Sequence, residues 1–303
     1  MKKSLGVVIG PSGIGKAHIR ELINYGFQNI YLLGKKFKKD RVKDLKFKFL
    51  KNSKLFNLKN IHEIKKKKFN LINICSPTDL HYKHIKFFKN FSNSLLVEKP
   101  LLWIKKRNIS NYKLSKKILT DSRTKIFVNL PMISLANQLK QKQKISRIKN
   151  FSFNYFTNGK KTYDDIAVDL LPHALSLFFQ LTKNTFKNID IAEVSRERFK
   201  WKCKINIDNC DCVFSFKQNI QKKNSQLSFR INDDLYLRKQ VKVGNSYNFK
   251  LIKNKKKIIR LKNPMSDYLS HIIKSSNSKL SLKNNNQITI MSVKVSEKLI
   301  NFK

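Results

Sequence analysis

The sequence contains few acidic residues, few cysteines and no long uninterrupted apolar run. A membrane-spanning helix needs roughly 18 consecutive apolar residues, so we predict a protein that does not cross a membrane. The first apolar stretch, residues 5–9, stops at a glycine-rich segment that Lys16, His18 and Arg20 follow closely. This pattern predicts a first strand rather than an export signal, and we expect a cytoplasmic protein.

Cysteine is scarce, with four residues in the chain: Cys75, Cys203, Cys210 and Cys212. Cys210 and Cys212 are closer together than zinc-binding cysteines usually are, and no histidine lies near enough in the sequence to complete a set of ligands. We therefore expect free thiols in a reducing compartment and no bound metal.

Acidic residues number 19 against 65 basic ones, which gives a formal net charge of +46. A charge of this size is typical of proteins that bind nucleic acids or anionic membranes. Here the basic residues are mostly lysine, not arginine with its phosphate-binding fork, and they are spread along the whole chain. The chain is also rich in asparagine, isoleucine and phenylalanine, which share A/T-rich codons with lysine. We expect neither a membrane partner nor specific nucleic-acid binding, only salt-sensitive nonspecific affinity. Functional affinity for a polyanion remains an alternative.

Short apolar runs alternate with helical periodicity through the first half of the chain. Ile19, Leu22 and Ile23 have the spacing of one helix face, and Gly26 follows where that helix would end. Alternating strands and helices predict an α/β fold, a parallel sheet with helices on both faces that binds ligands at the carboxyl ends of its strands. The candidate strands are residues 5–9, 29–33, 70–75, 95–99 and 125–129.

The second half of the chain contains a series of β segments separated by polar turns. The length of the chain allows two domains of about 150 residues each. We predict one domain over residues 1–121 and a second over residues 122–303, with a helix over residues 292–302 at the end. The candidate β segments are residues 151–155, 199–207, 212–216, 227–231, 235–243 and 257–261.

A glycine-rich turn follows the first candidate strand and precedes the first helix. Gly10 and Gly15 match the outer glycines of the G-x-G-x-x-G fingerprint, and Ser12 occupies the middle position. That middle glycine normally lets the backbone approach a pyrophosphate closely. Serine is small, its hydroxyl can donate to a phosphate, and Gly13 can supply part of the missing clearance. We interpret the turn as a dinucleotide site; a turn that is tight for structural reasons alone is the alternative.

The second candidate strand has no acidic residue after it. An acid at this point would bind the ribose hydroxyls of NAD, whereas positive charge would accommodate the 2′-phosphate of NADP. Gly34, Lys35 and Lys36 stand there instead. The sequence therefore favours NADP slightly over NAD, and both cofactors remain open.

Two further motifs carry reactive side chains. Glu98-Lys99-Pro100 ends an apolar run, and a strand that ends in a lysine downstream of a dinucleotide-type turn is a credible location for hydride chemistry. Asp169 and His173 are four residues apart, so they share one helix face. A carboxylate one turn from a histidine can orient the ring and raise its basicity. The alternative is an ordinary contact on the surface of a helix.

Four blocks of sequence, in this order and at this spacing, resemble the Gfo/Idh/MocA oxidoreductases, the group of glucose–fructose oxidoreductase and inositol dehydrogenase. The resemblance implies a nucleotide-binding N-terminal domain with a Rossmann-type parallel sheet. It also implies a C-terminal α+β domain with an open, mostly antiparallel sheet that covers the nicotinamide and mediates homo-oligomer formation. The blocks are residues 15–20, 74–81, 97–100 and 169–173.

The resemblance also implies roles for individual residues. Lys99 would hold the substrate oxygen and the cofactor, His173 would act as base or acid, and Asp169 would position the substrate or its partner. The substrate would be a sugar, a cyclitol or a related polyhydroxy or carbonyl compound, with NAD or NADP as cofactor. The implied cofactor contacts are Gly10, Ser12, Gly13, Ile14, Gly15, Lys35, Ser76, Pro77, His81, Glu98 and Lys99.

Three features depart from the pattern of that family. Ser12 replaces a glycine, no acid follows Leu33, and residues 163–168 stand where glycine-rich packing usually precedes Asp169. A second class of function therefore stays open. It is a basic Rossmann-type protein that binds a nucleotide or a polyanion without turnover.

Overall fold

The computed structural model describes most of the chain, in two compact units. The described residues are 5–34, 53–65, 68–105, 108–120, 123–182, 186–221, 225–243, 246–274 and 279–302. The first unit comprises Met1–Ile109, Lys113–Asn129 and Leu269–Asn286. The second unit comprises Ser110–Tyr112, Leu130–Tyr268 and Gln287–Lys303.

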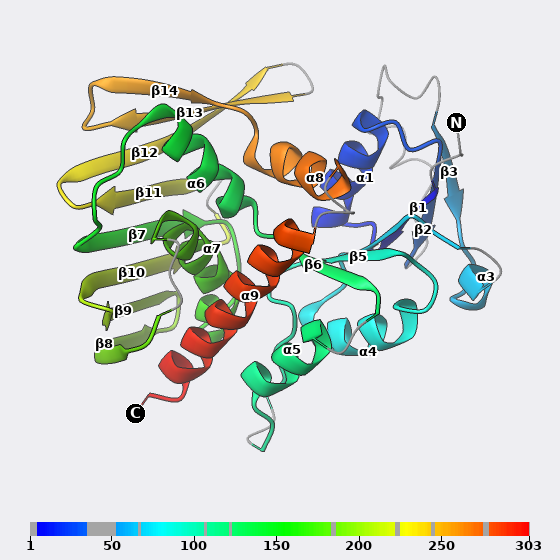
Figure 1. The fold of residues 1–303 in the computed structure, drawn as a ribbon, viewed down its shortest axis with the longest axis horizontal. Helices are drawn as coiled ribbons and strands as arrows, with labels where there is room; N and C mark the ends of the chain where they lie inside the picture. The colour runs from blue at the N-terminus through cyan, green and yellow to red at the C-terminus, as the bar shows by residue number, and fades with distance from the viewer. Residues whose placement is uncertain are drawn as a thin grey trace. The chain divides into compact units, whose positions relative to one another are not determined.

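The first unit contains a six-stranded sheet in which every neighbouring pair is parallel (Figure 1). Its strands are β1 (Leu5–Ile9), β2 (Asn29–Leu33), β3 (Lys54–Asn57), β4 (Leu71–Ile74), β5 (Ser94–Val97) and β6 (Lys125–Val128). Its helices are α1 (Ile14–Asn24), α3 (His62–Lys65), α4 (Thr78–Phe88) and most of α5 (Asn111–Thr120). The strand order is β3-β2-β1-β4-β5-β6. This order reverses between β1 and β4, and doubly wound sheets bind ligands at such a point.

The apolar sequence explains the first strand and helix of this unit. Residues 7–9 of β1 are almost completely buried between two parallel neighbours. On α1, Ile19, Leu22 and Ile23 are buried, as their spacing predicts. The helix ends before Gly26, whose φ of 87° favours glycine over other residues. The parallel sheet predicted for this half of the chain is confirmed.

Main-chain hydrogen bonds continue for one residue beyond β1, β4, β5 and β6. The residues concerned are Gly10, Cys75, Glu98 and Asn129, whose amides donate to carbonyl oxygens of neighbouring strands over 2.7–2.9 Å. These four residues form one row along the carboxyl edge of the sheet, which we call the carboxyl-edge row. Their side chains therefore start from backbone positions that the sheet itself fixes.

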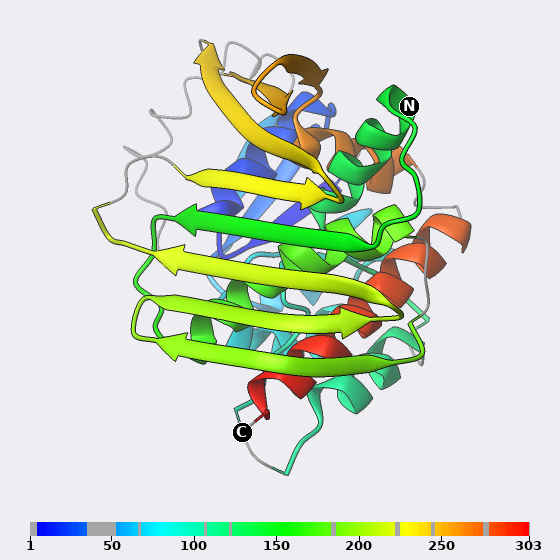
Figure 2. The ribbon, with the colours of Figure 1, turned by 90° about the vertical axis from the view of Figure 1, so that its left-hand side faces the viewer.

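The second unit contains an eight-stranded sheet in which only β7 and β10 pair in parallel and all other neighbours are antiparallel. Its strands are β7 (Asn150–Thr157), β8 (Ile189–Glu197), β9 (Lys200–Ile207), β10 (Cys210–Gln218), β11 (Gln226–Ile231), β12 (Asp234–Val243), β13 (Ser246–Lys253) and β14 (Lys257–Leu261). The order is β14-β13-β12-β11-β7-β10-β9-β8. Helices α6 (Pro131–Lys142) and α7 (Asp164–Thr182) belong to this unit. Figure 2 looks onto the face of the sheet opposite to these helices.

Two further helices, α8 (Pro264–Lys274) and α9 (Lys279–Ile300), contribute residues to both units. In the first unit, Asn285 of α9 pairs with the main chain of Val128 on the edge strand β6. Its Oδ1 accepts from the Val128 amide and its Nδ2 donates to the Val128 carbonyl oxygen, both over 2.9 Å. The side-chain amide thus satisfies the backbone donor and acceptor of Val128 on the edge strand, as a neighbouring strand would. The last helix begins at Lys279, well before the predicted residue 292.

The core of the second unit lies between its sheet and α7. Phe153, Phe214 and Phe229, on three neighbouring strands, are completely buried. On α7, Leu170 and Leu177 are among the buried residues that anchor the helix, as the apolar spacing predicts. The open, mostly antiparallel sheet that the family resemblance implies is confirmed.

Three strands are not predicted by the sequence patterns. β3 has only four residues, most of them exposed. β8 carries acidic residues and a register shift between Ile191 and Glu193, which breaks the alternation of apolar and polar residues. β13 mixes lysine, asparagine and serine with its apolar residues. Each is held by pairing with its neighbours, a contribution that no local pattern reveals.

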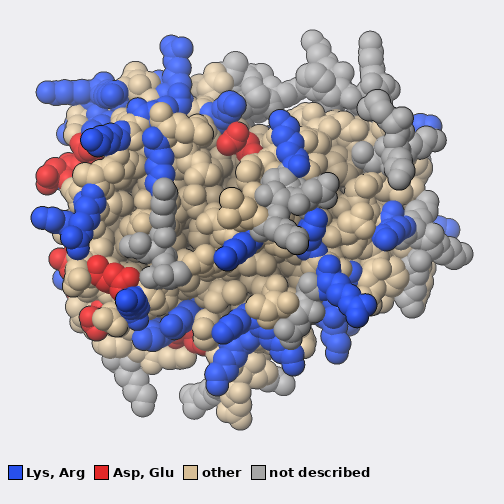
Figure 3. Space-filling view, in the orientation of Figure 1, with Lys and Arg blue, Asp and Glu red and all other residues tan. Residues whose placement is uncertain are grey.

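The basic side chains do not form a single patch on the surface face shown in Figure 3. Lys and Arg side chains are spread over this face. Among the helices that the structure describes, none is both long enough and apolar enough to cross a membrane. The described residues contain no group of three His, Cys, Asp or Glu side chains that could hold a metal ion. The four cysteines are free and buried.

We predict that Phe153→Ala lowers the free energy of unfolding of the second unit by about 3–5 kcal/mol, because the lost ring leaves a cavity on a central strand. Val241→Ala, on a side chain that is 50% exposed, is the control and should change it by less than about 0.5 kcal/mol. Urea unfolding followed by fluorescence of Trp201, buried in the same unit, measures both variants. Equal effects of the two substitutions would contradict this assignment of the core.

Candidate active site

The turn between β1 and α1 has no room for side chains at two of its glycines. A Cβ atom on Gly10 would lie 2.8 Å from the carbonyl oxygen of Cys75, and one on Gly15 would overlap the carbonyl oxygen of Gly10. Gly10 and Gly13 also have positive φ angles of 78° and 56°. The backbone of the turn therefore requires glycine at all three positions.

The crest of this turn, residues 12–14, is exposed. Nothing lies within 4 Å of the point where a Gly13 Cβ would be, so the backbone is open to a ligand there. No side chain caps the start of α1, and its first turn carries no acidic residue. The amides and the helix dipole at such an end favour an anion. Ser12, Gly13 and Ile14 therefore form a cradle that fits a phosphate group.

Lys99 lies directly beyond β5, next to the carboxyl-edge row. It is the one partly exposed residue in a run that is otherwise buried from residue 94 to residue 102. Glu98 before it is 7% exposed and Leu101 after it is 1% exposed. The side chain of Lys99 is thus the part of this run that can reach a ligand.

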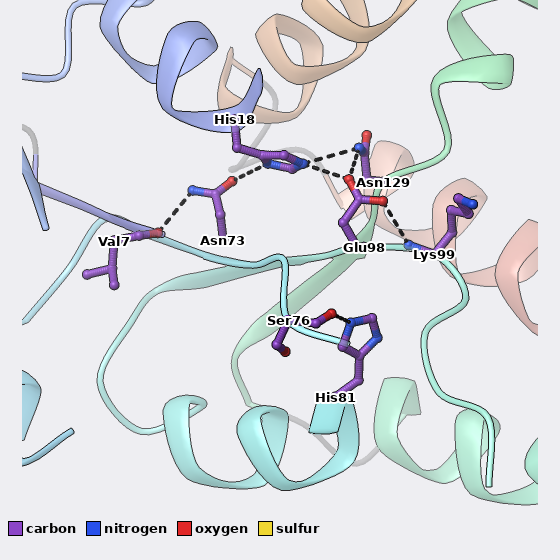
Figure 4. A network of polar contacts seen from close by, with 8 residues as sticks. All are labelled: Val7, His18, Asn73, Ser76, His81, Glu98, Lys99 and Asn129. Atoms are coloured by element: carbon purple, nitrogen blue, oxygen red, sulfur yellow. Dashed lines mark hydrogen bonds and ion pairs between the residues drawn. The ribbon is translucent and has the colours of Figure 1, made fainter. Parts of the chain in front are cut away.

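His18 of α1 and Glu98 form a buried ion pair at the same edge (Figure 4). The Nε2 atom of His18 lies 2.7 Å from Oε1 of Glu98, and its Nδ1 atom lies 3.1 Å from Oδ1 of Asn73. Asn73 Nδ2 donates to the carbonyl oxygen of Val7, which fixes the orientation of the amide. Both nitrogens of the His18 ring therefore face acceptors, and both must donate.

The pKa values of the pair agree with this geometry. Burial opposes the charged ring, but the neighbouring Cys75 sulfur and the Glu98 carboxylate together raise the pKa of His18 well above its usual range. Burial raises the pKa of Cys75, and the neighbouring His18 opposes this effect. Burial also opposes the Glu98 carboxylate, but the hydrogen bond and charge of His18, with Asn129 and Lys99, lower its pKa.

Asn129 is the third member of this network. Its Nδ2 atom donates to Oε1 of Glu98 over 2.6 Å, which fixes the amide because its oxygen would repel the carboxylate. The second carboxylate oxygen of Glu98 accepts from the amide of Lys99 over 3.3 Å. Oδ1 of Asn129 is a buried acceptor with no hydrogen-bond partner in the described part of the chain.

His81 of α4 lies below the same segment, and it is 1% exposed. Its Nδ1 atom lies 2.9 Å from the carbonyl oxygen of Pro100 and 3.2 Å from that of Leu101. Its Nε2 atom lies 2.8 Å from the carbonyl oxygen of Ser76 (Figure 4). The ring therefore joins the loop after β4 to the loop after β5.

Ser76 and Pro77 form that first loop, and Pro77 is the residue that immediately precedes α4. The hydroxyl of Ser76 lies 2.8 Å from Nδ1 of His84. Burial, together with the neighbouring His81 and Lys83, lowers the pKa of His84. A neutral His84 can accept a hydrogen bond from the Ser76 hydroxyl, which fixes this loop beside the turn after β1.

A second polar cluster lies in the second unit, around α7. The carboxylate of Asp169 lies 3.2 Å from Nζ of Lys161 and 3.5 Å from Nε2 of Gln218. The ring of His173 meets the ring of Tyr155 edge-on, with 5.8 Å between centroids. The guanidinium of Arg238 lies 5.6 Å from the centroid of the same Tyr155 ring. Carboxylate, imidazole, phenol and cations are therefore present within one unit.

The structure places the predicted site residues in two groups. Gly10 to Gly15, Ser76, Pro77, His81, Glu98 and Lys99 lie in the first unit, at or next to the carboxyl edge of its sheet. Asp169 and His173 lie one turn apart on α7 in the second unit. Lys35 lies outside the described residues. The roles of these residues stay predictions.

Several residues of these clusters were not among the predicted site residues. They include His18, Asn73, Asn129, Lys161 and Gln218. Asn73 interrupts an apolar strand, and Asn129 ends one, so a polar residue in each apolar run was the available signal. Lys161 and Gln218 come from a loop and from the end of β10, and folding alone brings them to Asp169. Local sequence patterns give no signal for such contacts.

Comparison with known proteins supports the fold. No protein-family model matches the chain, and no curated protein matches its sequence. A dehydrogenase (MviM) from Clostridium difficile superposes with a TM-score of 0.68 at 16% identity over 99% of each chain. The WlbA (WbpB) dehydrogenase from Thermus thermophilus, solved with NAD and UDP-GlcNAcA, gives 0.66 at 12% identity over 99% of this chain and 95% of its own.

KijD10, a 3-ketoreductase from Actinomadura kijaniata solved with NADP and TDP-benzene, gives a TM-score of 0.69 at 10% identity over 98% of this chain and 97% of its own. The protein therefore shares its fold with these two dehydrogenases and this ketoreductase over nearly its whole length. At these identities the comparisons establish the fold, and the chemistry must be argued from the residues.

We predict that Glu98→Gln lowers the free energy of unfolding by about 3–5 kcal/mol between roughly pH 4.5 and 6.5, because His18 loses its buried counter-ion. The lowered pKa of Glu98 stabilises the native state above its unfolded pKa, and this contribution is lost as the pH falls through the folded value. The raised pKa of His18 stabilises the native state at pH values below the pKa of the unfolded chain. This contribution is lost as the pH rises through the pKa of the folded state.

The difference between wild type and variant should therefore be largest in that window and decline on both sides. Urea unfolding at a series of pH values measures it. Glu193→Gln, whose carboxylate pairs with Lys204 on the surface, is the matched control. A flat difference between the wild type and Glu98→Gln across the whole range would contradict the buried ion pair.

Proposed function

We propose that the protein is an NAD(P)-dependent oxidoreductase that transfers hydride between a nicotinamide and a sugar, a cyclitol or a related polyhydroxy or carbonyl compound. One observation carries the proposal. The open glycine turn after β1 and the partly exposed Lys99 after β5 belong to the same carboxyl edge of one parallel sheet. Ligands of doubly wound sheets bind at that edge.

The residues present fit a dinucleotide. The exposed crest of Ser12, Gly13 and Ile14 offers backbone amides and a positive helix end to a pyrophosphate. The serine at the middle position of the fingerprint is itself exposed, so its side chain does not fill the cradle. Ser76, Pro77 and His81 belong to the adjacent strand end, and the unpartnered Oδ1 of Asn129 supplies an acceptor there.

The nicotinamide, when bound, accepts or gives a hydride at its C4 atom. The chain must then handle a proton and orient the reacting oxygen. We assign the orientation of that oxygen to the ammonium of Lys99. We assign the proton to the imidazole of His173, which takes it from a hydroxyl in oxidation and returns it to a carbonyl oxygen in reduction. Asp169, held by Lys161, positions the substrate.

We assign nucleotide binding and substrate binding to the two domains expected from the sequence. We propose that residues 1–121 bind the nucleotide and that residues 122–303 bind the substrate; β6 lies beyond that boundary and pairs with β5. We also propose that two copies associate through the eight-stranded sheet, which light scattering of the purified protein tests. The preference for NADP stays a prediction, since Lys35 lies outside the described residues.

The proposal is tested by titrating the purified protein with NADPH and NADH and then assaying a panel of polyols and sugars at the nicotinamide absorbance. We expect Lys99→Ala and His173→Ala each to lower kcat by about 10²- to 10⁴-fold, because a positioned acid–base group or hydrogen-bond donor is lost. Binding of the nucleotide, followed by quenching of tryptophan fluorescence, should persist in both variants.

Lys117→Ala and His62→Ala are matched controls, because both side chains are exposed and lie on α5 and α3. They should leave kcat unchanged. Absence of binding for both nucleotides, with polyanion affinity that ignores Lys99→Ala and His173→Ala, would show a binding protein without turnover.

A further inference from the structure

We propose that His18 and His81 are positioning residues for Lys99, each of which fixes one end of the buried segment 98–101 from an opposite side. This inference rests on the proposed function, in which Lys99 orients the substrate oxygen. In Figure 4, His18 lies above and His81 lies below the end of the strand that leads into Lys99.

The first end of the segment is held through the side chain of Glu98. His18 contacts Oε1 over 2.7 Å, Asn129 donates to the same oxygen over 2.6 Å, and Oε2 accepts from the Lys99 amide. The carboxylate is therefore held by two side chains and by the main chain of the residue it must orient. Since His18 lies on α1, directly after the glycine turn, the contact also ties the phosphate cradle to the lysine.

The second end is held through main-chain oxygens. His81 reaches the carbonyl oxygens of Pro100 and Leu101 with one ring nitrogen and that of Ser76 with the other. A carbonyl oxygen only accepts, so a ring nitrogen that carries a hydrogen donates to the oxygens beside it. His81 is thus a brace between the loops that follow β4 and β5.

The two histidines share a property that suits a positioning role. Both rings are buried, at 0% and 1% exposure, and their nitrogens contact oxygens and an amide near the carboxyl edge of the sheet. A buried hydrogen-bonded ring has one orientation, so the backbone on both sides of Lys99 has one position.

Fixing the backbone matters because Lys99 has a long, flexible side chain. Four rotatable bonds separate its ammonium from the main chain. A shift of the main chain at Lys99 therefore also shifts the ammonium. A misplacement of about 1 Å at a reacting group can lower the rate by about 10²-fold. We therefore expect substitution of His18 or His81 to change kcat more than it changes nucleotide binding.

The first test needs no variant. The chain contains six histidines, so the ring signals of the ¹⁵N-histidine-labelled protein can be resolved. At about pH 6 the N–H protons of exposed rings exchange rapidly with water, whereas buried hydrogen-bonded ones persist. We expect the ring N–H signals of His18 and of His81 to be observed and protected from exchange. Rapid exchange of the ring N–H signals of either histidine would overturn the proposal for that ring.

The second test uses His18→Gln and His81→Gln, which keep one hydrogen-bonding end and remove the bridge. We expect kcat to fall about 10- to 100-fold with a dissociation constant for NADPH that changes less than about threefold. Deuterium uptake by a peptide covering residues 95–103 should rise in both variants. His62→Gln, on an exposed ring, should change none of these readouts.

A further control separates positioning from loss of stability. Phe69→Leu removes buried volume from the same unit, where Phe69 is 1% exposed and lies at the amino ends of the strands. It should lower the free energy of unfolding without changing kcat or uptake over residues 95–103. An equal loss of kcat in Phe69→Leu would overturn the positioning role.

The outcomes also separate this inference from the proposed function. If the protein turns over and both histidine variants retain full kcat and normal uptake, the positioning role is wrong and the oxidoreductase proposal stands. If no substrate of the panel is converted, the ring N–H signals and the uptake over residues 95–103 still decide whether the two histidines fix the segment.

Discussion

The carboxyl edge of the six-stranded sheet depends on backbone hydrogen bonds that continue past the strands. Each residue of the carboxyl-edge row is tied by its amide to the neighbouring strand, whatever side chain it carries. A glycine, a cysteine, a glutamate and an asparagine can therefore stand side by side in register. The parallel sheet determines where the side chains begin, and the side chains then determine the chemistry of the edge.

A buried carboxylate in such a row needs compensation for the water it has lost. Glu98 obtains it from a histidine on the first helix and an asparagine after the last strand, so elements far apart in sequence meet at one group. Removing either ionic partner would leave a buried charge without its counter-ion. Removing these contacts would therefore destabilise the protein. The same contacts also hold the edge in a single conformation.

The sequence predicted much of the fold, because buried parallel strands have continuous apolar runs and α1 has a clear helical face. It predicted the glycine turn and the strand that ends at Lys99, because those motifs are local. It did not reveal β3, β8 or β13, which are short, polar or irregular and are held by their neighbours. Nor did it reveal the partners of Asp169, Glu98 and His18. Lys161 and Gln218 reach Asp169, Asn129 reaches Glu98, and Asn73 reaches His18 only in the folded chain.

The cysteines have a practical consequence for spectroscopy. All four thiols are buried, and burial raises the pKa of Cys75 and brings that of Cys203 to about 12. Thiolates are the species that react with maleimides and nitroxide reagents, so Cys75 and Cys203 should be slow to label. A pair of cysteines introduced at exposed sites, one in each unit, would take up spin labels selectively. Pulsed electron paramagnetic resonance could then follow the distance between the two units as nucleotide is added.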